Sequence, residues 1–206
     1  MLYALHEMAY HSAVPFRLGA QMARQFWTSP FNPASETAIG RTAYASAELF
    51  ESLTRRYGKP DWRLDVRDSD GTPVAVSEEI FWSSPWCSLL RFVTDKADGG
   101  DKTASRPKVM VVAPLSGHYA TLLRGTVETF IQDHDVYVTD WTNARQVPLL
   151  EGRFDFNDYI DHVREMLAAI GGRAHVVAVC QPGPPVLAAC ALMAEEGHAN
   201  RPASMS

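Results

Sequence analysis

The segment Val176-Val177-Ala178-Val179-Cys180-Gln181-Pro182-Gly183-Pro184-Pro185 passes from an apolar run to a helical pattern within a few residues. The apolar run predicts a buried strand, and two consecutive prolines fit a first helical turn, where no backbone donor is required. A nucleophile elbow has this form, because its reactive residue lies on a tight turn and projects above the sheet. We therefore interpret Cys180 as a candidate nucleophile, near a helix N-terminus whose partial positive charge favours a thiolate.

The alternative role for Cys180 is that of a small buried apolar residue at a strand end, which is common for a lone cysteine. The glycine and prolines that follow Cys180 favour the elbow instead, so both roles remain open. Cys87 and Cys190 lie in apolar runs, so we expect both in the core. The chain has three cysteines and no C-x-x-C pair. A disulfide framework or a structural zinc site is therefore not expected, and we expect a reduced, cytoplasmic protein with no metal and no cofactor.

Two further strand–helix units precede this turn. A continuous apolar run at residues 109–113 predicts a strand buried on both faces of a sheet, and residues 136–139 are interpreted as the second strand. Helical patterns follow at 119–132 and at 157–170, which is the clearest helix and is ended by Gly171, and another lies at 186–196. Repeated βα units predict an α/β fold with a parallel sheet and right-handed crossovers.

The loop after the first of these strands is the second part of the candidate site. It reads Pro114-Leu115-Ser116-Gly117-His118 and leads into a helix. In this kind of fold such a loop contributes one backbone N–H to an oxyanion hole, and the residue after the nucleophile contributes another. We expect these donors in the region of Leu115 and Ser116 and at Gln181. Ser116 and His118 lie only two residues apart on a loop, which favours loop shape or substrate contact over a catalytic pair.

The first sixty residues have a different pattern of apolar and polar residues. Helical patterns at 1–27 and 35–57, the second with Ser35 as a possible cap, are separated by a breaker cluster at 28–33. Alternating segments at 62–66 and 74–81 predict an antiparallel hairpin, and 85–92 a further strand. The sequence thus predicts a helical region over residues 1–60, followed by a hairpin and the parallel sheet over 61–206.

Composition narrows the class of protein. The chain has 206 residues, of which 46% are hydrophobic and 21% charged, with a net charge of −5. These values are typical of a globular protein and argue against a disordered tail. A net negative charge gives no sign of the basic surface that binds a nucleic-acid backbone. No apolar stretch approaches the ~18 residues of a membrane span.

Three motifs together resemble the intracellular polyhydroxyalkanoate (polyhydroxybutyrate) depolymerases. They are Val-Val-Ala-Pro-Leu-Ser-Gly-His at 111–118, Val-Tyr-Val-Thr-Asp-Trp-Thr-Asn-Ala-Arg at 136–145 and Val-Cys-Gln-Pro-Gly at 179–183. The opening Met-Leu-Tyr-Ala-Leu-His-Glu and Arg-Tyr-Gly-Lys-Pro at 56–60 are similar too. The resemblance implies an α/β-hydrolase fold and cytoplasmic enzymes acting on storage-polyester granules. It also implies a Cys–Asp–His triad, of which the cysteine corresponds to Cys180.

One feature departs from that pattern. In α/β-hydrolases the acid and the histidine follow the nucleophile along the chain. Here 26 residues follow Cys180, with His198 as their one histidine, and Glu195 and Glu196 look like a helix end. We therefore expect residues 61–206 to be the first half of an α/β-hydrolase domain, truncated after the nucleophile helix. The sheet would then expose an apolar edge.

The resulting hypothesis is hydrolysis of polyhydroxyalkanoate ester bonds in the full-length protein through an acyl-cysteine intermediate, with the granule polymer as partner. Three alternatives remain. One is a polyhydroxyalkanoate synthase, whose G-x-C-x-G elbow is not matched by Ala178 and Pro182. Another is a non-catalytic granule-associated protein whose helical region binds polyester or a partner. The last is a serine hydrolase that uses Ser116.

Overall fold

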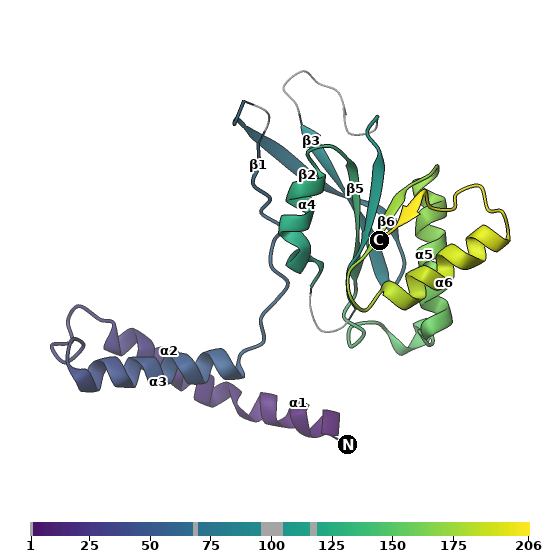
Figure 1. Ribbon diagram of the computed structural model, residues 1–206. Coiled ribbons are helices and arrows are strands. Elements are labelled where there is room, and N and C mark those ends of the chain that lie inside the picture. The colour runs from purple at the N-terminus through teal and green to yellow at the C-terminus, as the bar shows by residue number, and fades with distance from the viewer. Residues whose placement is uncertain (1, 68–69, 96–104, 116–118) are drawn as a thin grey trace. The chain divides into compact units, whose positions relative to one another are not determined.

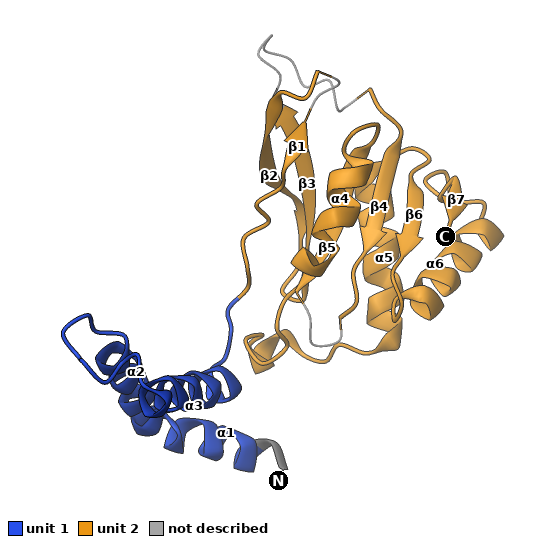
Figure 2. Ribbon diagram, turned by 60° about the vertical axis from the view of Figure 1, so that its left-hand side comes forward, with its two compact units in different colours: residues 1–58 blue, residues 59–206 orange. Residues whose placement is uncertain are grey.

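The computed structural model describes residues 2–67, 70–95, 105–115 and 119–206. The chain forms two compact units, unit 1 from Met1 to Gly58 and unit 2 from Lys59 to Ser206 (Figure 2). Within the described ranges, none of the helices combines the length and apolar character that crossing a membrane requires.

Unit 1 consists of three helices, α1 (Leu2–Ser12), α2 (Val14–Trp27) and α3 (Ala38–Thr54). The single helix expected over residues 1–27 is interrupted at Ala13, because Pro15 falls in the first turn of α2, where its missing N–H is tolerated. Thr37, not the expected Ser35, caps α3: its side-chain oxygen accepts a hydrogen bond from the Gly40 N–H at 3.1 Å.

Unit 2 is built on one seven-stranded sheet with the order β1-β2-β3-β5-β4-β6-β7 (Figure 2). Its strands are β1 (Val66–Arg67), β2 (Pro73–Ser83), β3 (Cys87–Asp95), β4 (Lys108–Val112), β5 (Asp135–Trp141), β6 (His175–Ala178) and β7 (Ser204–Met205). The pairs β1–β2, β2–β3 and β3–β5 are antiparallel, whereas β5–β4, β4–β6 and β6–β7 are parallel. The predicted α/β class is confirmed, and the hairpin strands join the same sheet as the parallel ones.

Helices cover both faces of this sheet. On one face lie the short helix η1 (Ala120–Leu123) and α4 (Arg124–Phe130), and on the other α5 (Phe156–Ile170) and α6 (Gly183–Glu195) (Figure 1). Side chains alternate along the strands accordingly. In β4, Val109 and Val111 belong to the core under α4, while Met110 and Val112 belong to the core under α5 and α6. The buried strand predicted at 109–113 therefore serves two cores.

Two predicted segments differ in detail from the structure, and one short strand was not predicted. The hairpin strand predicted at residues 62–66 is observed only as the two-residue strand β1. Trp62 lies outside that strand and is buried, with its ring edge-to-face with Phe92 at a centroid distance of 4.9 Å. Helix α6 begins at Gly183 instead of residue 186. β7, at the far edge, pairs with β6 through Ser204 and Met205.

Candidate functional site

The turn that carries Cys180 is tight. β6 ends at Ala178 and α6 begins at Gly183, so four residues connect a strand to a helix. Cys180 has φ +67°, a left-handed conformation that costs a non-glycine residue about 1–2 kcal/mol. The turn is closed by a hydrogen bond from the Gly183 N–H to the Cys180 carbonyl at 3.1 Å. The side chain of Cys180 is exposed. This geometry presents a thiol to solvent at the carboxyl end of the strands, as a nucleophile elbow does.

The loop after β4 lies beside this turn. β4 and β6 are parallel neighbours, with Val112 opposite Ala178, and the Val179 N–H donates to the Val112 carbonyl at 3.1 Å. The segments that follow β4 and β6 therefore leave the sheet side by side, at the same edge. Leu115, three residues after Val112, has 39% of its surface exposed. The structure thus brings the Leu115 segment and the Cys180 turn to one edge of the sheet.

Two side chains from β5 hold the start of the same loop. The Ala113 N–H donates to the Thr139 hydroxyl oxygen at 2.9 Å, in a fully buried contact, and the Trp141 indole N–H donates to the Ala113 carbonyl at 3.0 Å. Both backbone polar groups of Ala113 are satisfied across the sheet, which fixes the direction in which the chain leaves β4. Sequence reasoning missed both residues. The available signal was a threonine directly after the apolar run Val136-Tyr137-Val138.

The remaining predicted oxyanion residues are placed in part. Gln181 is exposed and directly follows Cys180 in the turn. Ser116 and His118 lie outside the described residues, so the expectations for them stay untested.

The other two cysteines differ from Cys180 in burial. Cys87 is fully buried at the start of β3, and Cys190 is half-buried and packs against the core. Burial raises the pKa of the Cys87 thiol well above its ordinary value, an effect to which the charge of Asp140 adds. Burial also raises the pKa of Cys190. Both therefore remain protonated thiols, and the exposed Cys180 is the cysteine that an ester can approach.

The histidine that follows Cys180 lies far from it. His198 comes after the thirteen-residue helix α6, which extends about 20 Å away from the turn at 1.5 Å per residue. The ring Nδ1 of His198 accepts a hydrogen bond from the Asn200 backbone N–H at 3.1 Å, and the backbone N–H of His198 donates to the Met193 carbonyl at 2.8 Å. These contacts shape the end of the helix. His198 cannot be the base for Cys180 in this geometry.

His162 is half-buried on α5. Its Nδ1 faces the Asp158 carbonyl at 2.9 Å and its Nε2 faces the Ser84 hydroxyl at 2.9 Å. Because a carbonyl can only accept, Nδ1 donates to Asp158, and the Ser84 hydroxyl lies within hydrogen-bond distance of both Nε2 and the Cys87 carbonyl, the latter at 3.3 Å. The same hydroxyl oxygen accepts N–H groups of Trp86 and Cys87 at 3.2 and 3.1 Å, so this serine belongs to a structural turn.

An aromatic cluster surrounds this histidine and reaches the end of β5. Ring centroids lie 4.4–5.7 Å apart in the pairs Trp82–His162, Phe154–His162, Trp86–Phe154, Trp141–Phe154 and Trp141–Tyr159. The Tyr159 hydroxyl in this cluster is buried without a hydrogen-bond partner in the described structure. Desolvation is the main cause that raises the Tyr159 pKa above its ordinary value of 10, and the neighbouring Cys87 adds to it.

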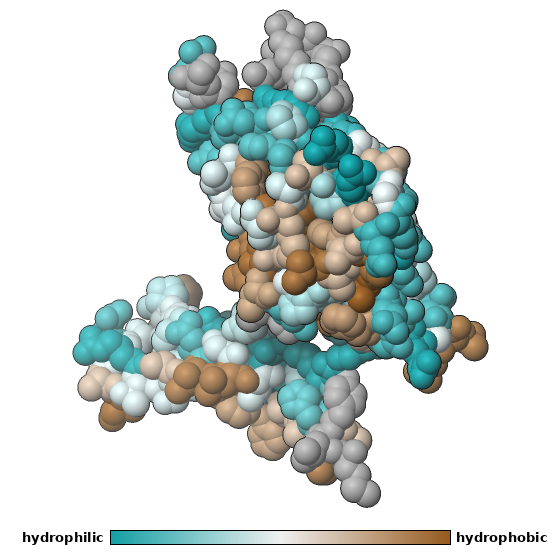
Figure 3. Space-filling model, turned by 45° about the vertical axis from the view of Figure 1, so that its right-hand side comes forward, coloured by the Kyte–Doolittle hydropathy of each residue, from teal (hydrophilic) through white to brown (hydrophobic). Residues whose placement is uncertain are grey.

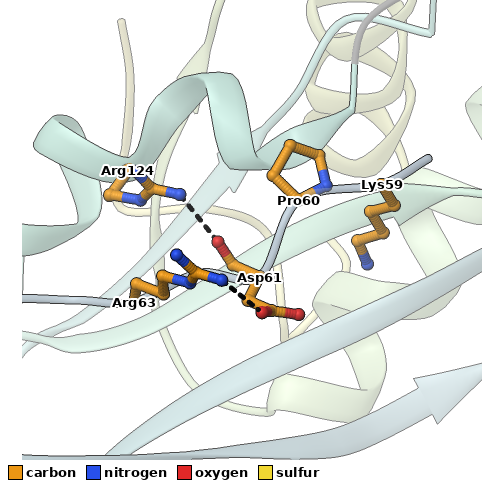
Figure 4. Close-up of a pocket in the computed structure, with 5 residues that line it drawn as sticks. All are labelled: Lys59, Pro60, Asp61, Arg63 and Arg124. Carbon is orange, nitrogen blue, oxygen red and sulfur yellow. Dashed lines mark hydrogen bonds and ion pairs between the residues drawn. The ribbon is translucent and has the colours of Figure 1, made fainter. Parts of the chain in front are cut away.

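A polar pocket of about 340 Å³ lies near the start of unit 2 and is lined by Lys59, Pro60, Asp61, Arg63 and Arg124 (Figure 4). Arg124 donates to the Asp61 carbonyl at 2.7 Å, and Arg63 to the Asp61 carboxylate at 3.3 Å. Lys59 forms an ion pair with Asp140 on β5. The lining is charged, whereas sites for apolar ligands are mainly apolar. This pocket is unsuited to an aliphatic acyl chain.

The described residues contain no cluster of three or more His, Cys, Asp or Glu side chains arranged to hold a metal ion.

Comparison with known proteins gives a partial similarity to a solved structure. No protein-family model matches the chain, and no curated protein matches it. Among solved structures, the chain is similar to the naproxen esterase (carboxylesterase NP) from Bacillus subtilis, with a TM-score of 0.42 and 13% sequence identity. The match covers 65% of this chain and 42% of that one, so the chain spans less than half the length of the esterase.

Proposed function

We propose that the chain is the nucleophile-bearing part of a carboxylic ester hydrolase, with Cys180 as the nucleophile. One observation carries the proposal: an exposed cysteine with φ +67° on a four-residue turn between a buried strand and a helix. A backbone held in this conformation is costly and persists when the surrounding structure enforces it. Arg63, with φ +42°, is the other non-glycine residue with positive φ in the described chain, and it lies on the polar pocket.

The proposed reaction has two steps. The Cys180 thiolate attacks the ester carbonyl and forms a carbon–sulfur bond, while the carbonyl oxygen becomes an oxyanion. Backbone N–H groups of Gln181 and of the Leu115–Ser116 region stabilise that oxyanion. The intermediate collapses, the alkoxide leaves and takes up a proton, and an acyl-thioester remains on Cys180. Water then attacks the thioester, releasing the carboxylic acid and returning the thiol. We assign the general base to none of the described histidines.

The substrate class follows from the resemblance of three motifs to the intracellular polyhydroxyalkanoate depolymerases. We propose 3-hydroxyalkanoate ester bonds of a storage polyester, in the cytoplasm at the granule surface. Such a substrate is uncharged, which agrees with an exposed apolar Leu115 on the loop beside the Cys180 turn. The contacts of Ala113 with Thr139 and Trp141 would keep that loop in the position that acylation requires.

The experiment is a burst assay with the p-nitrophenyl ester of 3-hydroxybutyrate. The chain should release about one equivalent of p-nitrophenol per Cys180 in a fast phase, because acylation precedes slower hydrolysis of the thioester. Cys180→Ala should abolish the burst, and Cys190→Ala, which removes a half-buried thiol, should leave it unchanged. A burst of the same size in Cys180→Ala would refute the nucleophile assignment.

A further inference from the structure

We propose that Trp141 is a positioning residue, which through one hydrogen bond aligns the backbone N–H of Leu115 with the oxyanion that forms when an ester acylates Cys180. The role of Leu115 as an oxyanion donor rests on the proposed function, whereas the hold of Trp141 on the loop after β4 is a property of the structure. Such a side chain sets the rate of acylation without touching the ester.

The backbone between Ala113 and Leu115 has few free dihedral angles. The Trp141 indole N–H donates to the Ala113 carbonyl at 3.0 Å, and that carbonyl lies in the plane of the peptide bond to Pro114. The pyrrolidine ring then holds φ of Pro114 at about −65°. A residue before proline is itself confined to extended backbone, which restricts Ala113 as well. The angle ψ of Pro114 is therefore the one soft dihedral between the plane held by Trp141 and the plane of the Leu115 N–H.

The other polar group of Ala113 is held from the same strand. Its N–H donates to the Thr139 hydroxyl oxygen at 2.9 Å in a fully buried contact. Thr139 and Trp141 lie two positions apart on β5, so their side chains leave the same face of the sheet. The Thr139 bond keeps Ala113 against β5, and the Trp141 bond directs the peptide unit that follows. The two side chains therefore have separate tasks.

Packing fixes the indole ring that makes this bond. The Trp141 ring centroid lies 4.4 Å from the Tyr159 ring and 5.7 Å from the Phe154 ring. Tyr159 is buried on α5, and Phe154 packs against the same core. A donor whose own ring is held by its neighbours keeps its acceptor in one direction, which is the condition for a preorganised oxyanion site.

An oxyanion at Cys180 depends on backbone N–H groups, because the two segments that meet there carry no cation. Residues 109–115 and 176–194 contain no charged side chain. Apolar area is visible on the face of unit 2 in Figure 3. Removing one oxyanion donor from a hydrolase slows the reaction by about a hundredfold to a thousandfold. Loss of the Trp141 bond leaves the Leu115 donor present but misdirected, so the expected loss is smaller, about tenfold.

The test compares Trp141→Phe with Trp86→Phe in the whole chain. Trp141→Phe keeps an aromatic ring in the cluster and removes the N–H that the Ala113 carbonyl accepts. Trp86→Phe is the matched control, since its ring stacks on Phe154 at 5.1 Å and its indole N–H has no hydrogen-bond partner among the described residues. In the burst assay with the p-nitrophenyl ester, Trp141→Phe should acylate Cys180 about tenfold more slowly than wild type, with the burst amplitude unchanged. Trp86→Phe should acylate within twofold of wild type.

A second reaction separates a positioning role from a structural one. Iodoacetamide alkylates a thiolate without forming an oxyanion, so it reports on the Cys180 thiolate alone. Mass spectrometry of the Cys180 peptide should show alkylation of Trp141→Phe within twofold of wild type. Acylation of Trp141→Phe at the wild-type rate would overturn the inference. An equal loss of acylation and alkylation would overturn it too, because Trp141 would then support only the shape of the turn.

Failure of the proposed function gives a different pattern. A wild-type chain without a burst would refute the enzyme, and the orientation of the Leu115 N–H can be followed by NMR in either case. Its order parameter should fall in Trp141→Phe and stay at the wild-type value in Trp86→Phe. An unchanged order parameter in Trp141→Phe would refute the hold of Trp141 on the loop, whether or not the chain hydrolyses esters. A lowered order parameter without any burst would leave that hold in place and remove its catalytic role.

Discussion

The left-handed backbone at Cys180 makes a prediction about stability that does not depend on activity. A residue with a Cβ costs about 1–2 kcal/mol at φ +67°, whereas glycine adopts this conformation without that cost. Glycine loses about 0.5–1 kcal/mol more conformational entropy on folding than alanine does. The difference leaves Cys180→Gly more stable than Cys180→Ala by about 0.5–1 kcal/mol. Because the side chain is exposed, removing the thiol itself adds little in either variant.

A second cysteine provides the control with the opposite sign. Cys190 lies inside α6, where the backbone is helical and glycine costs about 1 kcal/mol relative to alanine. Cys190→Gly should therefore be less stable than Cys190→Ala by about that amount. The same pair of substitutions thus stabilises at one position and destabilises at the other.

The assay is urea unfolding of the whole chain followed by tryptophan fluorescence. Four of the five tryptophans, Trp62, Trp82, Trp86 and Trp141, belong to unit 2, so the signal reports on the unit that contains Cys180. A change in the midpoint with an unchanged slope gives the difference in unfolding free energy. If Cys180→Gly were no more stable than Cys180→Ala while Cys190 behaved as expected, the turn would not be strained, and the elbow argument would fail.

Three other predictions concern single side chains. Thr139→Val should lower the unfolding free energy by about 1–3 kcal/mol, because it leaves the Ala113 N–H buried without an acceptor, and an unchanged urea midpoint would contradict this. Tyr159→Phe should cost little unfolding free energy at pH 7, since the hydroxyl has no partner in the described structure. The raised Tyr159 pKa contributes stability below pH 10 that is lost as the pH rises. In urea titrations at each pH, this variant should therefore lose less stability above pH 10 than wild type. Glu51→Gln should destabilise unit 1 by about 3 kcal/mol, because it leaves Arg24 and Arg55 without their buried partner. Glu48→Gln should have little effect, because 45% of the Glu48 side chain is exposed. Equal thermal loss of helical circular dichroism in both variants would argue against the buried Glu51 ion pairs as contacts that stabilise unit 1.

The parallel half of the sheet could be predicted from the sequence. Continuous apolar runs predicted β4, β5 and β6, because strands that are buried on both faces need apolar side chains at every position. Helix α5 was predicted within one residue, since its apolar positions share one face and Gly171 ends it. In both cases the decisive information is local in the chain.

The antiparallel half depended on contacts between distant segments. β3 pairs with β5, with Cys87 opposite Trp141, more than fifty positions apart in the chain, and no local pattern specifies that choice. The break between α1 and α2 was missed although Pro15 signals it, because the apolar spacing continues across the proline.

The candidate site divides in the same way. The strand–Cys–helix turn was visible as a run of residue types, whereas the left-handed φ of Cys180 appears only when the strand and the helix are both in place. The contacts of Thr139 and Trp141 with Ala113 join side chains on β5 to the backbone after β4. Hydrogen bonds of this kind depend on register, which the sequence does not show.

The central claim is that an ester acylates Cys180, and mass spectrometry of the labelled chain tests it most directly. The chain is incubated with the p-nitrophenyl ester of 3-hydroxybutyrate, quenched in acid and cleaved into peptides. We predict a 3-hydroxybutyryl thioester on the peptide with Cys180, formed faster in the folded chain than in the urea-unfolded chain, in which the oxyanion donors are not held in place. Acylation of a serine peptide instead, or equal labelling of Cys180 in the folded and unfolded chain, would contradict the account.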